Sequence, residues 1–563
     1  MRVLIIILTL FVSCKLQAQN INWSRGAAKT ELSAINSLNV DGNGNSYFGG
    51  MFSDTVITEE FNFKTQPGKY KILCGKYKND GTLIWAAADG ECDAIYSYSS
   101  AYDQSGNLYV GGSCRGDITF NGITYQNINS GFLAKFDNQG NPQWIELVKG
   151  IFDSYSSGIS FLRTDSENNI YIFGSFVGAV DFGDTTVASL PKPWSNAVLA
   201  KYNPSGKCLW ARSYLPTGVN LPATKPSSLE IDEDNNVYVA GGLVGTLTLN
   251  STTSVTSDGE DIFLLKLDRD GNSKWLTKIG IANTSEFGQL SDICNGTMYF
   301  CMRFQGDSTI VNGEIYKGVV NKHNVVTGNV LIKFDTSGAV QWSKLIDVPV
   351  QNAGYVNTME VDLDKTGDAI VSGCYGGSID FIDTTLSNDG DLDPFILRFD
   401  HMGNLLEIWS EGYKTDEYIS STEIDACGNY YVAGMFFDST GLGGVPLKTK
   451  NSKWSYFLTK ISTNSECEII TGIEQRVELS DVTIFPNPVY NKEVVQIEIA
   501  KAMYGPATIK IRDLVGNMVY EQSVSNKSNT RLEVAAGNLV TGTYFVEIYD
   551  GRKLQVKKLV VIE

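Results

Sequence analysis

Histidine is scarce in this chain of 563 residues, which contains only His323 and His401. A Ser-His-Asp triad uses histidine as its base, and catalytic zinc sites commonly use two or three histidines. The scarcity therefore argues against a serine-triad hydrolase and against a multi-histidine zinc enzyme. Phosphate-binding loops are missing as well, because no Gly-x-Gly-x-x-Gly motif precedes a predicted helix.

Basic residues are outnumbered by acidic ones. Lysine and arginine total 45 against 63 aspartates and glutamates, which gives a net charge of −18. Such a balance disfavours nucleic acids and anionic membranes as partners, because both repel an acidic surface.

Apolar runs long enough to span a bilayer are also missing. The run at residues 3–12 is too short, but Arg2 precedes it and Leu16-Gln17-Ala18 follows it. These are the three regions of a secretory signal peptide, so we expect residues 1–18 to be removed. An alternative interpretation makes residues 11–14 a lipoprotein box with a lipid on Cys14.

Tryptophan, by contrast, recurs with a near-constant period of 59–67 residues. A second marker alternates with it, Asp-x-x-Gly/Asn-Asn-x-Tyr, as at residues 165–171. Asp opens such a turn by accepting backbone N–H bonds, and Gly or Asn takes the position with positive φ. Alternating apolar residues flank the turn, so it joins two antiparallel strands. The seven tryptophans are Trp23, Trp85, Trp144, Trp210, Trp275, Trp342 and Trp409.

Each repeat therefore contains four strands, which describes a β-propeller blade. The seventh repeat stops at residues 456–460 without its tryptophan strand, whereas the mature chain begins with that strand alone, Ile21-Asn22-Trp23. We expect the N-terminal strand to complete the last blade and close the ring, which removes exposed strand edges. The predicted fold is all-β, with a seven-bladed β-propeller over residues 19–470.

The pattern changes after a polar linker at residues 471–483. Short alternating strands then predict a small antiparallel sandwich of the immunoglobulin-like kind. The blocks Ile-Phe-Pro-Asn-Pro (484–488), Asp-Leu-Val-Gly-Asn (513–517) and Leu-Val-Thr-Gly-Thr-Tyr-Phe-Val (539–546) follow in order. With them, residues 484–563 resemble the type A C-terminal sorting domain of type IX secretion. The matching positions are Pro486, Asn487, Pro488, Gly516, Gly542, Tyr544 and Lys558.

This resemblance implies export to the cell surface or the medium, with the type IX secretion machinery as partner and later removal of the domain. The repeats, with a downstream Val180-Asp181-Phe182, also resemble the SBBP-type β-propeller repeat. That second resemblance implies a fold and no agreed chemistry.

Ten cysteines are present, and nine remain without Cys14. An odd number leaves at least one unpaired within the chain. Cys427 and Cys467 flank the last blade and are predicted to form a disulfide there. Cys294 and Cys301 are a second candidate pair.

Carboxylates near the predicted channel are candidate site residues. Counting back from each turn Asp, by two residues in six blades and by one at Asp292, gives one residue per blade, all expected near the channel if the first strands are innermost. Glu230, Asp362 and Glu423 would then serve as an acid/base pair or bind a cation. Alternatively, polar residues beside a wet channel have no function. The channel candidates are Arg163, Glu230, Asp362 and Glu423, with Asn39, Ala101 and Ser291 at the equivalent positions.

Asp-rich turns at residues 268–272 and 362–368 faintly resemble calcium loops but lack the terminal glutamate of a full loop. Hairpin chemistry explains them, so we expect no cofactor and no metal site, with calcium as the alternative.

These observations favour a non-catalytic protein of the surface or medium whose propeller binds a glycan or a protein. An extracellular carboxylate-dependent glycoside hydrolase or lyase is one alternative, and a surface scaffold without a soluble ligand is another. Long connections between second and third strands, such as 183–196 and 305–330, are the expected binding loops.

Overall fold

The computed structural model divides the chain into two compact units, Met1–Ile469 and Ile470–Glu563. It describes residues 20–462 and 482–562, apart from short segments at 28, 151–157, 183–184, 188–195, 258, 281–284, 383, 389–391, 413–414, 441–446, 450–452, 491–493, 500–506, 514–517, 525–529, 536–538 and 550–553. The predicted signal peptide and residues 471–481 of the predicted linker lie outside the described residues.

The first unit contains seven blades of four antiparallel strands. Blade 1 comprises β2 (Lys29–Val40), β3 (Ser46–Ile57), β5 (Tyr70–Tyr77) and β6 (Leu83–Cys92). Blade 2 comprises β7 (Ala94–Tyr102), β8 (Leu108–Phe120), β9 (Ile123–Phe136) and β10 (Pro142–Gly150), and blade 3 comprises β11 (Gly158–Thr164), β12 (Ile170–Phe176), β15 (Asn196–Tyr202) and β16 (Cys208–Tyr214). Blade 4 comprises β17 (Ala223–Ile231), β18 (Val237–Val244), β21 (Asp261–Leu267) and β22 (Ser273–Ile279).

The long strand β29 (Val340–Leu363) passes from blade 5 into blade 6. The other strands of blade 5 are β23 (Ser285–Leu290), β24 (Thr297–Gln305) and β28 (Val326–Asp335), and those of blade 6 are β30 (Ala369–Phe381), β32 (Asp393–Phe399) and β33 (Leu405–Ser410). Blade 7 comprises β34 (Glu417–Ile424), β35 (Tyr430–Phe437), β38 (Trp454–Ser462) and β1 (Asn20–Gly26).

Shorter strands lie in the connections between second and third strands. They are β4 (Asn62–Lys64), β13 (Val180–Asp181), β14 (Thr186–Val187), β19 (Thr246–Asn250), β20 (Thr253–Thr256), β25 (Ser308–Val311), β26 (Glu314–Lys317), β27 (Val319–Val320), β31 (Thr384–Ser387), β36 (Ser439–Thr440) and β37 (Leu447–Lys448). The predicted binding loop at 305–330 contains the β25–β26 hairpin, the short strand β27 and the start of β28, whereas most of the loop at 183–196 lies outside the described residues.

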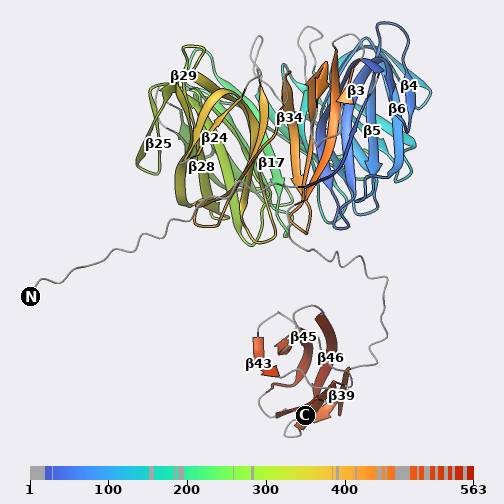
Figure 1. Ribbon diagram of the computed structural model, residues 1–563, viewed down its shortest axis with the longest axis vertical. Coiled ribbons are helices and arrows are strands. Elements are labelled where there is room, and N and C mark those ends of the chain that lie inside the picture. The colour runs from blue at the N-terminus through green and yellow to red at the C-terminus, as the bar shows by residue number, and fades with distance from the viewer. Residues whose placement is uncertain are drawn as a thin grey trace, which may run out of the picture. The chain divides into compact units, whose positions relative to one another are not determined.

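The ring closes as the sequence predicts. Strand β1 pairs antiparallel with β38, with Trp23 opposite Lys460 and Gly26 opposite Phe457. In Figure 1 the orange strands of blade 7 accordingly lie beside the blue strands of blade 1. The first strands of neighbouring blades contact one another all the way round, from β2 through β7, β11, β17, β23 and β29 to β34. They therefore form the wall of a central channel.

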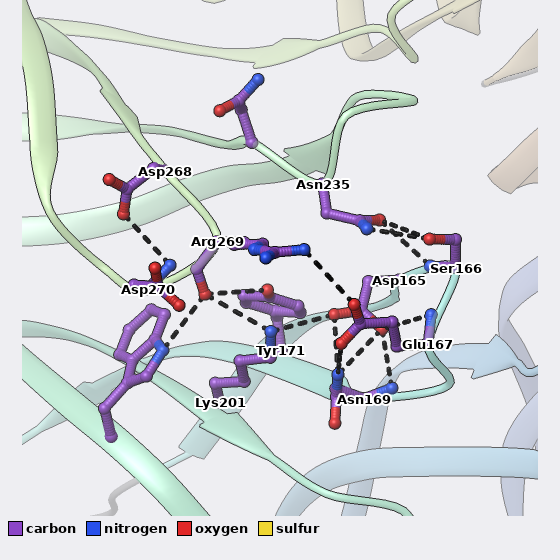
Figure 2. Close-up of polar contacts among 12 residues, drawn as sticks. Asp165, Ser166, Glu167, Asn169, Tyr171, Lys201, Asn235, Asp268, Arg269 and Asp270 are labelled. Atoms are coloured by element: carbon purple, nitrogen blue, oxygen red, sulfur yellow. Dashed lines mark hydrogen bonds and ion pairs between the residues drawn. The ribbon is translucent and has the colours of Figure 1, made fainter.

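The Asp turns join first to second strands at one end of the ring, called here the turn face. The opposite end is the connection face. Asp165 shows how a turn is held, because its Oδ1 accepts the backbone N–H groups of Glu167 and Asn169 at 3.0 and 2.8 Å. Lys201 Nζ pairs with Asp165 Oδ2 at 3.0 Å and lies 4.8 Å from the centre of the Tyr171 ring. Figure 2 shows these contacts.

The recurring tryptophans attach each blade to the next. Trp275 Nε1 donates to the Thr336 carbonyl at 3.1 Å, and the indole packs on Gly338 of the following blade. A Cβ at Gly338 would lie 3.2 Å from that ring, so the turn needs glycine for the close approach as well as for its φ of +84°. The pairs of this kind are Trp23–Gly81, Trp85–Gly140, Trp144–Gly206, Trp210–Gly271, Trp275–Gly338 and Trp342–Gly403.

The second unit is a sandwich of two sheets, as predicted. One has the order β39 (Val482–Phe485), β41 (Val494–Ile499) and β44 (Thr530–Ala535), and the other β40 (Val489–Tyr490), β46 (Leu554–Ile562), β45 (Gly542–Tyr549), β42 (Ala507–Asp513) and β43 (Met518–Val524). Buried residues of both sheets, including Ile497 and Ile511, share one core.

Candidate binding site in the central channel

The inner strands place polar side chains around two cavities. The first, about 410 Å³, opens at the turn face, where it is lined by residues of the Asp turns such as Asp103 and Asp232. The second, about 320 Å³, lies toward the connection face. Arg163, Glu230, Asp292 and Glu423 line both cavities, so this set lies where the two meet.

The structure brings the predicted channel residues together, except in blade 5, where a neighbouring residue lines the channel instead. Asn39, Ala101, Arg163, Glu230 and Glu423 line the first cavity, and Asp362 lines the second.

In blade 5 the channel residue is Asp292, whereas the sequence pointed to Ser291, which is fully buried. The Asp-to-Tyr spacing there is one residue longer than at residues 165–171. The Ser291 N–H pairs with the Tyr299 carbonyl at 2.8 Å and closes a longer loop, so the predicted position lies one residue before the residue that lines the channel.

Glu360 is a channel residue that sequence reasoning missed. It lies two positions before Asp362 on β29, and the period of two in a strand puts both on one side. Its Oε2 accepts the backbone N–H of Thr422, in the neighbouring blade, at 3.0 Å. This alternation along the strand is the sequence signal for Glu360, which the position two residues before each turn Asp does not include.

Arg163 and Glu230 form a bidentate ion pair between blades 3 and 4. Arg163 Nε and Nη2 lie 2.7 and 2.5 Å from the two Glu230 oxygens. The Glu230 side chain is 3% exposed. Burial alone would lower the pKa of Arg163, but the charge of Glu230 raises it, so the guanidinium stays ionised.

Carboxylates outnumber cations around this ion pair. Burial and the neighbouring Asp292 raise the pKa of Glu230, and the Arg163 guanidinium opposes this shift by favouring the ionised carboxylate. Burial likewise raises the pKa of Glu360 to about 7. Burial and neighbouring carboxylates raise the pKa values of Asp362 and Glu423 well above their usual range. Part of this set therefore carries protons at neutral pH.

Two tyrosines stand on β7 where the chain enters the channel wall. Tyr96 and Tyr98 are 52% and 45% exposed, and their rings are stacked 6.3 Å apart at an angle of 8°. Tyr98 lines the second cavity, together with hydroxyl and amide side chains. These are Asn36, Ser37, Ser99, Ser160, Ser228, Gln289, Ser420, Ser421 and Thr422.

In the second unit, Asn487 binds the last strand at both ends of its amide. Its Nδ2 donates to the Lys558 carbonyl at 2.7 Å, and its Oδ1 accepts the Val560 N–H at 2.9 Å. Tyr544 is buried and donates to the Val540 carbonyl at 2.6 Å. Of the other motif residues, Pro486, Pro488 and Lys558 are exposed, Gly542 begins β45, and Gly516 lies outside the described residues.

The cysteine predictions have two outcomes. Cys427 is disulfide-bonded, and Cys467, its predicted partner, lies outside the described residues. The second candidate pair is wrong, because Cys294 and Cys301 both remain thiols. Cys301 is buried among apolar side chains of blades 5 and 6, where it serves as a core residue.

In the Asp-rich turn at residues 268–272, the Asp268 carboxylate already binds nearby protein donors. Asp268 accepts the Asn272 N–H at 2.9 Å and pairs with Lys274 at 2.8 Å. Within the described part of the chain, no group of three or more His, Cys, Asp or Glu side chains is arranged to hold a metal ion. Over the same residues, no helix is long and apolar enough to cross a membrane.

The chain is similar to two curated proteins, in each case over only part of that protein's length. The chain is 23% identical over 453 residues to an uncharacterized WD repeat-containing protein of Acanthamoeba polyphaga mimivirus, covering 63% of this chain and 31% of that protein. It is 28% identical over 179 residues to the regulatory protein FlaEY of Caulobacter vibrioides, covering 30% and 17%. The chain thus spans less than a third of either relative.

Solved structures resemble the chain only distantly. PorZ, described as an essential bacterial surface component of the type-IX secretion system of Porphyromonas gingivalis, is 12% identical, with 96% of this chain and 100% of that chain covered and a TM-score of 0.17. An alpha-L-arabinanase of Penicillium chrysogenum is 9% identical, with 64% and 92% covered and a TM-score of 0.34. Scores this low transfer no function.

The C-terminal unit is identified more sharply. Residues 483–562 match the secretion system C-terminal sorting domain. This confirms the resemblance drawn from the Pro-Asn-Pro and Gly-Thr-Tyr blocks, and it makes the type IX secretion machinery a partner. The chain therefore ends in a type IX sorting domain, and the protein is exported to the cell surface or the extracellular space.

Proposed function

We propose that this exported protein is a non-catalytic binding protein whose propeller, built from SBBP-type repeats, binds a glycan or a protein at the channel. The observation that carries the proposal is the pair of polar cavities of about 410 and 320 Å³ inside the ring. Volumes of this order suit a small ligand or a projecting group of a larger one.

The ion pair supports binding over catalysis. Arg163 contacts both oxygens of Glu230, so this carboxyl is already committed to a structural partner. Both residues of the pair line the two cavities, so the pair lies where the cavities meet.

A printed array of saccharides and extracellular proteins tests the proposal, with the purified full chain as the probe. We expect saturable binding to members of one class, without change in the mass of the bound molecule. Absence of binding to both classes would contradict the proposal and favour a scaffold role.

A carboxylate-dependent glycoside hydrolase or lyase is the second candidate, and one observation favours it. Burial and neighbouring carboxylates raise the pKa values of Asp362 and Glu423 well above their usual range, and a protonated carboxyl is what a general acid requires. Incubation with polysaccharides, followed by assay of reducing ends, tests it. Product formation that Asp362→Asn and Glu423→Gln both abolish would replace the binding proposal.

A further inference from the structure

The connection-face cavity carries an aromatic surface at its rim. Tyr96 and Tyr98 occupy alternate positions of β7, so their rings project to the same side of the strand. Both rings stay about half exposed although each offers a large apolar face. Parallel exposed rings beside a concavity present the flat surface on which the C–H face of a sugar ring packs.

Hydroxyl and amide groups continue from this surface into the cavity. Ser160, Ser228 and Gln289 come from three successive inner strands and line it beside Tyr98. Thr422 also lines it, and its Oγ1 is buried without a hydrogen-bond partner among the described residues. A buried hydroxyl without a hydrogen-bond partner destabilises the fold. A polyhydroxylated ligand would supply that partner if the Thr422 side chain moved slightly toward it.

Charge decides which ligands of this class fit. Glu230, Asp292, Glu360, Asp362 and Glu423 line the cavity, whereas its one cationic side chain among the described residues, Arg163, is paired with Glu230. A ligand carboxylate or sulfate would find no unpaired cation in this lining and would be repelled by those of its carboxyls that are ionised, whereas a neutral or amine-bearing ligand would not be repelled.

We propose that the connection-face cavity binds a short saccharide without acidic groups, with Tyr96 and Tyr98 stacking on a sugar ring and the serine, threonine and glutamine side chains binding its hydroxyls. This inference rests on the proposed binding function and specifies its ligand class. It places the ligand at the connection face and leaves the Asp turns of the turn face as structural elements.

The test uses the full chain and three immobilised sets of oligosaccharides: neutral, glucosamine-containing and uronic-acid-containing. We expect binding within the first two sets and none to the third. Tyr96→Ala and Tyr98→Ala should each weaken binding about tenfold, whereas Tyr98→Phe keeps the ring and should retain most of it. Tyr490→Ala, at an exposed tyrosine of the sorting domain, is the matched control and should bind like the parent chain.

Three results would overturn the inference: binding of uronic-acid oligosaccharides alone, binding of no saccharide, or saccharide binding that neither tyrosine variant weakens. If an alanine variant fails to fold, Tyr98→Leu takes its place: it keeps an apolar side chain without a flat ring and should also weaken binding, whereas Tyr98→Phe should bind nearly like the parent chain. Saturable binding of a protein without any saccharide would leave the proposed function standing and refute only the carbohydrate inference.

Discussion

Trp23 lies against Gly81, across the seam where the two ends of the ring meet. A Cβ at Gly81 would come within 2.6 Å of the indole, and Trp23 Nε1 donates to the Asn79 carbonyl at 2.9 Å. Trp23 belongs to blade 7 and Gly81 to blade 1. At the closure of the ring this contact is therefore equivalent to the Trp–Gly contacts between consecutive blades.

Gly81→Ala should therefore destabilise the propeller by about 2–5 kcal/mol, because the methyl group meets the indole and because φ is positive at this turn. Gly68 is a matched control, since its φ of +75° is close to the +80° of Gly81 and nothing lies within 4 Å of its Cβ position. Gly68→Ala should cost only about 1–2 kcal/mol. Urea denaturation of both variants checks the difference, and equal losses would contradict the role of the Trp23 contact.

Removal of residues 19–27 should leave blade 7 with three strands. The freed edge of β38 would expose unpaired backbone groups, so we expect a lower Tm and self-association at micromolar concentration. Light scattering after size-exclusion chromatography measures the association. A synthetic peptide of residues 20–27 should restore the monomer, and a monomeric truncated chain with unchanged Tm would refute closure by β1.

Glu360 should make stability depend on pH. Burial raises the pKa of its carboxyl from 4.5 to about 7. Between these values the folded chain keeps a proton that the unfolded chain releases, so this contribution to stability falls as pH rises and is fully lost above about pH 7.

Glu360→Gln should remove that part of the profile, which amounts to at most about 1.4 kcal/mol per pH unit. Denaturation series from about pH 4 to about pH 8 measure it. Glu59→Gln, at an exposed position outside the cavities, should leave the slope unchanged. A parallel loss of slope in both variants would assign the effect to net charge instead.

Asn487→Ala should weaken the sorting domain by about 1–3 kcal/mol, because the Val560 N–H and the Lys558 carbonyl both lose their partner. If the export machinery requires the folded domain, the variant should accumulate inside the cell envelope. Fractionation of cells measures the exported share, with Thr541→Ala, at an exposed position, as the control. Normal export of an unstable domain would show that recognition does not need this fold.

The sequence predicts the ring well because its markers are structural. Tryptophans from six of the repeats pack on a glycine of the following blade, and turn Asp residues such as Asp165 and Asp232 accept the same backbone N–H groups, so their period reports the number of blades directly. The channel residues are predicted correctly where the turn keeps its length, as between Asp165 and Tyr171. The prediction is wrong in blade 5, where the turn is one residue longer and Asp292 lines the channel.

Other features had no sequence marker. Tyr96 and Tyr98 alternate with buried residues as any strand residues do, and only the three-dimensional structure shows that Tyr98 lines a cavity and that the Tyr96 ring stacks on it. The paired oxygens of Glu230 were equally hidden, because Arg163 lies in another blade, 67 residues away.

Closure by β1 also makes completion of the ring depend on the presence of the whole propeller sequence. Among the described strands, β1 pairs with β38, so a propeller chain that ends before β38 cannot close the ring in this way. The sorting domain follows β38 in the chain, so only a chain that already contains all seven blades can carry the export signal. Truncated translation products would have an unpaired strand edge that can associate with other chains. They would also lack the sorting domain, so they would not be exported to the outer surface.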